Sequence, residues 1–173
     1  VDNKELKQTD FKESHFSDLG VGVYPGQNLE IEYRGNKISF RAPYKVVTFA
    51  DLLEEYLDID YDKISEIELF EFAEKKGLKL NKGMRKGKIA DEIYKEFIRN
   101  NIIQPIFMVN HPLELSPLAK KIENDQTKVE RFQLVVAGLE LMNGYSELND
   151  PIDQNERFLE QENVRKGGDE EAQ

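Results

Sequence analysis

The residues of this chain that could do chemistry gather in one short stretch. The sequence from Glu140 to Asp150 is ELMNGYSELND, which combines carboxylates, amides and an aromatic ring. Because this stretch follows the apolar residues Val135 and Val136, a buried Glu140 would need a cation, a hydrogen-bond donor or a metal ion beside it. A metal ion or a cationic ligand beside Glu140 would explain why a carboxylate occurs next to an apolar strand. Alternatively, Glu140 and Glu147 lie on the solvent side of a half-exposed sheet.

The elements that must position these side chains form a predicted β-hairpin. Two predicted strands, 131–136 and 139–145, flank the dipeptide Ala137-Gly138. A two-residue turn of this kind connects adjacent antiparallel strands. In a regular ladder around that turn, Val135 pairs with Glu140.

The same regular ladder pairs Gln133 with Met142, so Gln133 and Glu140 share one face of the sheet. Three further polar or aromatic residues have the opposite parity and should point to the other face, namely Asn143, Tyr145 and Glu147. They can join Glu140 in one pocket only if a β-bulge intervenes, and Asn143-Gly144 is the expected place for it. An unbroken ladder through Ser146 would exclude a single pocket.

Local patterns predict the elements before this hairpin. Residues 2–19 are polar and compatible with a helix, and the alternating run at 29–40 predicts a hairpin that turns at Gly35-Asn36. Residues 45–100 are predicted to be mainly helical. Within that range Thr48 is a candidate N-cap, and Ser65 begins a capping-box pattern for a helix that ends near Gly77.

The region between the helices and the hairpin contains a predicted strand at 102–109. Pro105 within it indicates an edge strand or an irregularity. His111 follows in a proline-marked loop, where a lone histidine is more often structural than catalytic. At the other end, Asp150 should cap a final helix that starts at Pro151.

One basic cluster stands outside these patterns, and it comprises Lys82, Arg85, Lys86 and Lys88. It could contact a phosphate group. Because Asp91, Glu92 and Glu96 follow closely, a solvated helix start is the simpler interpretation.

The composition limits the classes of protein to which this chain can belong. The chain has 173 residues, the length of one domain, and its 34 acidic and 24 basic residues give a net charge of −10. This charge argues against a general nucleic-acid or membrane-surface binder. Without cysteine, disulfide bonds and thiolate metal sites are impossible. No apolar run approaches the length of a membrane span, so no membrane partner is expected.

Several blocks of the sequence together resemble class II lysyl-tRNA synthetases, over roughly residues 85–171. These blocks are Gln104-Pro105, HPLELSPLAK from His111 to Lys120, Arg131-Phe132, NGYSELND from Asn143 to Asp150, Asp153-Gln154 and Arg157-Phe158. The SPLAK run is the most specific of them, because related class II synthetases generally lack it.

The resemblance implies an α+β fold, as part of a class II antiparallel-sheet catalytic domain. Residues 1–173 would be a partial catalytic domain, with a helical insertion at 45–100 and the active-site strands and following helix at 101–173. The family joins lysine to ATP with Mg²⁺ and transfers it to tRNA(Lys), in the cytoplasm and as a homodimer.

Residue roles follow from the same resemblance. Three residues would bind the substrate lysine: Asn143 through a hydrogen bond, Tyr145 beside the aliphatic stem and Glu147 facing the ammonium group. Glu140 would bind the magnesium ion. Gln133 stands where the family usually has a second metal-binding carboxylate, which leaves one negative charge fewer. An arginine is also common where this chain has Leu139.

The family's arginine-bearing ATP motifs and its anticodon-binding domain are not found in the sequence. Adenylation requires preorganised cations, so no catalytic residue is assigned here and the chain alone is expected to be inactive. Together with Val1 in place of an initiator methionine, this indicates a fragment lying between the second and third signature motifs.

Two alternatives remain open at this stage. A synthetase-like paralogue that attaches a lysine analogue to a translation elongation factor has a similar ELxNG run but lacks SPLAK. A non-catalytic binding module derived from a synthetase would have no need to keep Glu140, Asn143, Tyr145 and Glu147.

Overall fold

The computed structural model describes residues 29–81 and 83–166. The helix expected at 2–19 and the side chain of Lys82 lie outside these ranges. The chain divides into two units, 1–44 and 45–173, and each is described by itself. Within the described residues, no helix combines the length and the apolar character needed to cross a membrane.

The first unit contains the predicted hairpin. Strands β1 (Glu30–Tyr33) and β2 (Asn36–Ser39) pair in antiparallel fashion. The turn consists of Arg34 and Gly35, which both have positive φ, 49° and 75°. This is the geometry of a type I′ turn, the connection that suits the twist of two-stranded hairpins. The hairpin prediction is confirmed, and its turn lies one residue earlier than Gly35-Asn36.

A five-stranded sheet forms the second unit. Its strands are β3 (Lys45–Thr48), β4 (Ile106–Pro112), β5 (Lys121–Ile122), β6 (Asp125–Val136) and β7 (Leu139–Tyr145). The order is β3-β4-β6-β5, and β7 also pairs with β6. Only β3 and β4 run parallel; the other pairs are antiparallel. The expected α+β fold with a mostly antiparallel sheet is therefore confirmed, and β3 adds a strand at the start of the range predicted to be helical.

Helices α2 (Phe49–Leu57) and α3 (Glu66–Lys75) begin at the N-caps that the sequence predicts. Further helices are α4 (Lys86–Ile93) and α5 (Pro151–Lys166). Thr48 and Ser65 both form complete capping boxes, with Asp51 and Glu68 as their partners. Helix α4 continues into a π-helical turn, η1 (Tyr94–Ile98), and a 3-10 turn, η2 (Arg99–Asn101).

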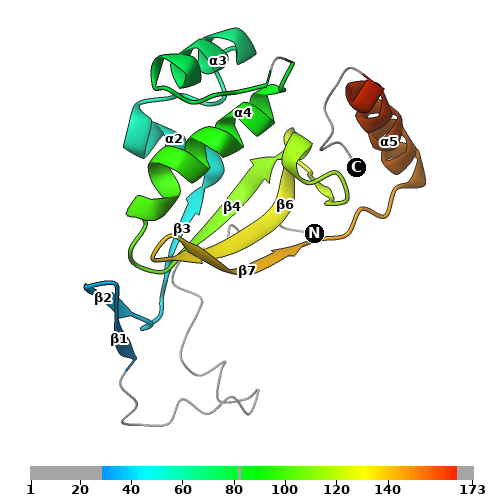
Figure 1. Ribbon diagram of the computed structural model, residues 1–173. Coiled ribbons are helices and arrows are strands. Elements are labelled where there is room, and N and C mark those ends of the chain that lie inside the picture. The colour runs from blue at the N-terminus through cyan, green and yellow to red at the C-terminus, as the bar shows by residue number, and fades with distance from the viewer. Residues whose placement is uncertain (1–28, 82, 167–173) are drawn as a thin grey trace. The chain divides into compact units, whose positions relative to one another are not determined.

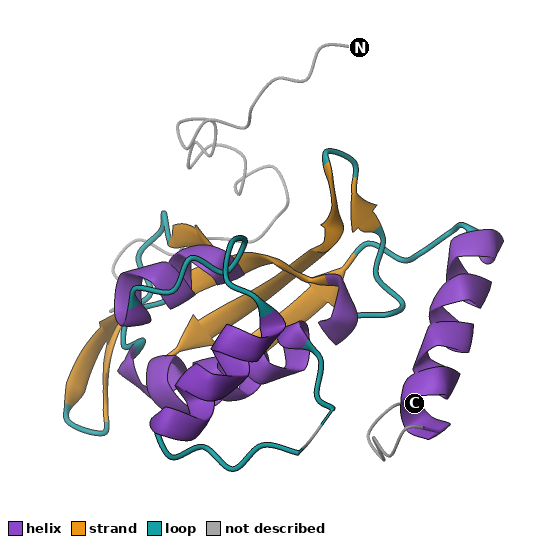
Figure 2. Cartoon of the chain, turned by 90° about the horizontal axis from the view of Figure 1, so that it is seen from above, coloured by secondary structure: helices purple, strands orange, loops and turns teal. Residues whose placement is uncertain are grey.

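The core lies between the helices and one face of the sheet. Helices α2 and α4 lie over β3 and β4, whereas α5 lies beyond the end of β7, away from these helices (Figures 1 and 2). The buried cluster combines helical residues with strand residues, and its largest members include Phe49, Leu52, Leu53, Ile89, Ile93, Ile98, Met108 and Val135. Apolar side chains of the helices thereby cover one face of the sheet.

Strand β4 departs from its prediction. It begins at Ile106, directly after Pro105, so the proline lies outside the ladder. The strand pairs with both β3 and β6 and is not an edge strand. Its irregularity is a register shift between Val109 and His111, where Asn110 has φ of 56°. His111 is therefore a buried strand residue, and its placement in a loop was wrong.

Candidate functional site

The β6–β7 hairpin carries the candidate site, and its register contains a bulge. Ala137 and Gly138 form the turn with positive φ, as predicted. Val135 lies opposite Glu140, which is also as predicted, but Leu134 lies opposite Met142. One residue of β7, Leu141, therefore has no partner on β6. The expected bulge exists, and it precedes Asn143-Gly144 rather than lying within it.

This bulge brings the predicted residues to one face of the sheet. After it, Gln133 pairs with Asn143 rather than with Met142, and Arg131 pairs with Tyr145. Residues 131, 133 and 135 alternate along β6 and share a face, so their partners share it too. Glu140, Asn143 and Tyr145 thus lie along one side of the hairpin, which was the condition for a single pocket.

Glu147 follows two residues beyond Tyr145, where the chain has left β6. Its backbone forms an isolated antiparallel bridge with Ala119. Two hydrogen bonds flank this bridge, from Lys120 N–H to the Ser146 carbonyl (2.8 Å) and from Leu148 N–H to the Leu118 carbonyl (2.9 Å). The SPLAK segment, Ser116 to Lys120, therefore bonds the backbone on both sides of Glu147, and β6 adds one further bond, from Ser146 N–H to the Glu130 carbonyl (2.9 Å). Glu147 is solvent-exposed, as a residue that meets a ligand must be before binding.

A buried polar chain supports Glu140 from below. The Gln133 side-chain nitrogen donates to Glu140 Oε2 over 2.6 Å, and Gln133 Oε1 lies 3.1 Å from His111 Nε2. Because a carboxylate can only accept, the amino group of Gln133 must face Glu140 and its oxygen must face His111. His111 then carries its proton on Nε2, and it packs against Phe49 with 6.0 Å between the ring centroids.

His111 is neutral in this environment. Burial lowers the pKa of its imidazole to about 4, and the positive charge of Arg131 acts in the same direction. Its Nδ1 atom is buried and finds no hydrogen-bond partner among the residues that the structure describes. A neutral histidine and a neutral amide thus stand behind Glu140, so the carboxylate is oriented without being neutralised from that side.

The magnesium assignment fits one of its two predicted residues. Glu140 presents a carboxylate, and Mg²⁺ in proteins is often held by one or two carboxylates together with substrate phosphates. Gln133 does not fit, because its only ligand atom, Oε1, is engaged by His111. Across residues 29–81 and 83–166, no three or more His, Cys, Asp or Glu side chains come together as a metal site. Glu140 would therefore contact a metal that arrives with a phosphate, and Gln133 would orient Glu140.

Arg131 is a site residue that the sequence analysis left without a role. Its Nε donates to Asn143 Oδ1 (3.0 Å), and its Nη1 donates to Ser116 Oγ (2.7 Å) and to the Leu115 carbonyl (3.3 Å). Burial lowers the pKa of Arg131, and the negative charge of Glu140 opposes this. Arg131 orients the side-chain amide of Asn143 by binding its oxygen, so the NH₂ group of Asn143 takes no part in that contact.

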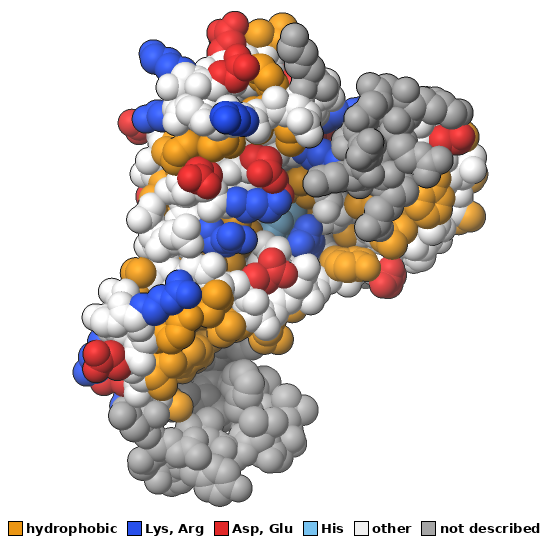
Figure 3. Space-filling model, viewed as in Figure 1, with side chains coloured by type: hydrophobic (Ala, Val, Ile, Leu, Met, Phe, Trp, Pro, Cys, Tyr) orange, Lys and Arg blue, Asp and Glu red, His pale blue; other side chains and the backbone are white. Residues whose placement is uncertain are grey.

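The face in Figure 3 shows basic and acidic side chains close together over the middle of the molecule. Of the predicted basic cluster, Arg85, Lys86 and Lys88 lie at the start of α4. There the Lys86 ammonium packs over the ring of Tyr61, 4.6 Å from its centroid, and the Lys86 backbone N–H donates to Glu66. These contacts agree with a structural helix start.

Comparison with known proteins gives consistent matches. The family model for tRNA synthetases class II (D, K and N) matches residues 9–173. A lysine–tRNA ligase of Porphyromonas gingivalis is 46% identical over 143 residues, which cover 83% of this chain and 25% of the relative.

Further relatives carry the same name. A lysine–tRNA ligase of Thermoanaerobacter pseudethanolicus is 40% identical over 144 residues, which cover 83% of this chain and 29% of the relative. One of Christiangramia forsetii is 44% identical over 137 residues, covering 79% and 24%. The chain thus spans about a quarter of the length of the curated relatives that it matches.

Proposed function

This chain belongs to the class II tRNA synthetase family of the D, K and N type, and from that premise we propose that it forms the lysine-binding part of a lysine–tRNA ligase. The protein that contains it would join lysine to ATP with Mg²⁺ and transfer the lysyl group to tRNA(Lys). It would act as a homodimer in the cytoplasm.

One observation carries the choice of lysine. Asn143 and Tyr145 lie on the same face of β7, and the carboxylate of Glu147 follows on the same extended run. An amide, an aromatic ring and a terminal carboxylate suit the three parts of a lysine molecule in turn. A carboxylate would attract the lysine ammonium group and repel the side chain of aspartate.

The chain's own residues have distinct tasks in this proposal. Asn143, oriented by Arg131, hydrogen-bonds the amino acid, and Tyr145 packs beside the aliphatic stem. Glu147 pairs with the ammonium and sets the length of side chain that the pocket accepts. Glu140, held by Gln133, contacts the magnesium ion that accompanies ATP and supplies charge compensation for the phosphates.

The arginines of the described site serve the scaffold rather than the phosphates. Arg131 is bound to Asn143 and Ser116, and Arg157 forms an ion pair with Asp153. Stabilisation of a phosphoryl centre requires cations aimed at it. We therefore expect the chain to provide the amino-acid end of the site, with the adenylation centre completed by other parts of the protein.

The test is a segment exchange. This chain replaces the matching segment of the Porphyromonas gingivalis ligase, and amino-acid-dependent ATP–pyrophosphate exchange is measured with lysine, aspartate and asparagine. We expect exchange with lysine alone. The unmodified ligase is the control. Exchange with aspartate or asparagine, or none in a chimera that melts at the temperature of the host, would contradict the proposal.

A further inference from the structure

The SPLAK segment is a spacer within the sheet. On one side Lys121 pairs with Val129 of β6, and Glu130 N–H donates to the Lys120 carbonyl (2.8 Å). On the other side, Lys120 N–H donates to the Ser146 carbonyl. The segment therefore lies between β6 and the run that follows β7. Its position determines where that run, and Glu147 within it, can lie.

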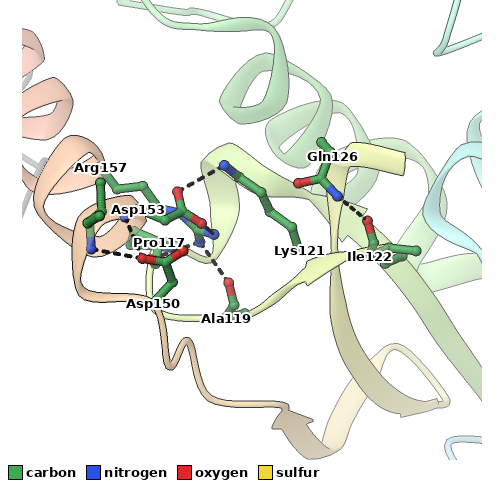
Figure 4. A network of polar contacts seen from close by, with 9 residues as sticks. Pro117, Ala119, Lys121, Ile122, Gln126, Asp150, Asp153 and Arg157 are labelled. Atoms are coloured by element: carbon green, nitrogen blue, oxygen red, sulfur yellow. Dashed lines mark hydrogen bonds and ion pairs between the residues drawn. The ribbon is translucent and has the colours of Figure 1, made fainter. Parts of the chain in front are cut away.

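Arg157 on helix α5 holds this segment at its centre (Figure 4). Its Nη1 donates to the Ala119 carbonyl (2.7 Å) and to the Pro117 carbonyl (3.1 Å). Its Nε and Nη2 form a two-pronged contact with the Asp153 carboxylate, 3.0 and 2.6 Å long. Lys121 donates to the same carboxylate over 2.9 Å. One buried guanidinium thus joins helix and segment.

The planar guanidinium group of Arg157 is suited to joining the helix and the segment. Its side chain is only 7% exposed. Four hydrogen bonds use all three of its nitrogens, in two directions that a planar guanidinium can serve at once. A lysine at this position would offer one ammonium nitrogen and could not reach both carbonyls and both carboxylate oxygens.

We propose that Arg157 is a positioning residue for Glu147. The link is Ala119, whose carbonyl accepts from Arg157 and whose backbone is the bridge partner of Glu147. Arg131 fixes the other end of the segment through Leu115 and Ser116. The α5 helix thereby sets the depth of the carboxylate that selects lysine. This role rests on the proposed function of Glu147.

The experiment uses the 173-residue chain and the variants Arg157→Met and Arg157→Lys. NMR measures amide hydrogen exchange at Lys120 and Leu148, whose N–H groups close the bridge, with Ile89 N–H in α4 as the internal reference. The same samples are titrated with lysine and with norleucine, which lacks the ammonium group. Lys128→Met is the matched control, because Lys128 is also well buried but its ion pairs go to Asp62 and Asp125.

We expect Arg157→Met to speed exchange at Lys120 and Leu148 at least about tenfold, to leave Ile89 unchanged and to weaken lysine binding about tenfold. Arg157→Lys should give a partial effect, which also covers the case that Arg157→Met does not fold. Unchanged exchange in Arg157→Lys, or an effect equal to that of Lys128→Met, would overturn the proposal.

Two other results separate this proposal from the proposed function. Faster exchange with unaltered lysine affinity would refute the positioning role and leave lysine binding intact. A wild-type chain that does not respond to lysine would count against the proposed function, and the exchange rates would then decide alone whether Arg157 holds the bridge.

Discussion

Gln133 and Asn143 face each other across the β6–β7 ladder. Two residues further along β6, Val135 faces Glu140, so β7 contains one residue more than β6 over this interval. In a regular strand, two residues that are three positions apart point to opposite faces of the sheet. The extra residue, Leu141, reverses this. Glu140 and Asn143 consequently lie on the same face, although their spacing in the sequence is odd. The candidate site depends on this bulge.

Glu147→Gln should separate the binding of lysine from that of ATP. In the segment-exchanged ligase, we expect the KM for lysine to rise about 10- to 100-fold, because a charge-assisted hydrogen bond in a binding site contributes about 1.5–3 kcal/mol. The KM for ATP should change less than about threefold, since Glu147 contacts the amino acid only. Pyrophosphate exchange at varied lysine and ATP measures both constants.

The control for this substitution is Glu123→Gln, in an exposed turn before β6. It makes the same chemical change outside the site and should leave both constants unaltered. Equal increases in the two KM values for Glu147→Gln would refute the role of Glu147 as the ammonium contact.

Gln133→Glu should create a magnesium-dependent stability. The new carboxylate would lie at hydrogen-bond distance from Glu140, where Gln133 now donates over 2.6 Å. Two carboxylates in that position repel each other, and we expect a loss of about 1–3 kcal/mol in the free energy of unfolding. Millimolar Mg²⁺ should restore part of it, because the pair then offers two anionic ligands. Thermal melts with Mg²⁺ or EDTA measure both effects.

The wild-type chain, with Glu140 as its one carboxylate here, should melt at the same temperature with and without Mg²⁺. Asn81→Asp, which adds the same charge at an exposed loop position before α4, should behave like the wild type. A variant Gln133→Glu that gains nothing from Mg²⁺ would show that this pair of positions is not a metal site.

The sequence predicts local structure in this chain well, because local structure depends on neighbouring residues. The capping boxes of Thr48 and Ser65 need only residues within one helical turn, and the Ala137-Gly138 turn spans only two residues, of which Gly138 accepts positive φ readily. The presence of a bulge could be inferred from the parity of the site residues. Its position at Leu141 could not, because it depends on packing across the ladder.

The hydrogen-bond partners of buried polar groups could not be predicted from the sequence either, because they also depend on packing between distant elements. His111 and Gln133 are 22 residues apart, and Arg157 binds the Ala119 carbonyl across 38 residues. Such contacts arise when distant elements are brought together, and no local pattern indicates them. Arg131 and Arg157 both belong to blocks that carry the family resemblance, and that membership is the signal that could have directed attention to them.

Gly144→Ala should destabilise the hairpin through one identifiable clash. A Cβ atom at Gly144 would lie 2.7 Å from Cε1 and 2.9 Å from Cζ of Phe132. Phe132 would have to move away and lose its edge-to-face contact with Phe107, whose ring centroid is 5.9 Å away. We expect a loss of about 1–2 kcal/mol, measured by urea unfolding.

The matched test for this clash is the double variant Gly144→Ala/Phe132→Leu. Leucine removes the ring atoms that the new methyl group would meet, so the two changes should cost at least about 1 kcal/mol less together than their sum. Strictly additive effects would show that the cost at Gly144 has another origin.

Asp153 should make the stability of the chain depend on pH in the acid range. The hydrogen bonds from Arg157, and secondarily from Lys121, lower the pKa of its carboxyl from 3.8 to about 2 in the folded chain. The unfolded chain therefore binds the proton more readily between these two values, and the free energy of unfolding falls as the pH falls. The contribution of the ionised group is complete above about pH 4 and is lost towards about pH 2.

Urea unfolding of the wild type and of Asp153→Asn over this pH range measures the effect. At neutral pH the wild type should be more stable by about 1–2 kcal/mol, and the difference should shrink steadily below about pH 4. Lys121→Met should reduce the pH dependence only in part, because the bond from Arg157 is the larger cause of the lowered pKa. A difference between wild type and Asp153→Asn that stays constant down to about pH 2 would mean that the carboxyl titrates alike in the folded and unfolded chains. The ion pairs of Asp153 with Arg157 and Lys121 would then contribute nothing to stability through their charge.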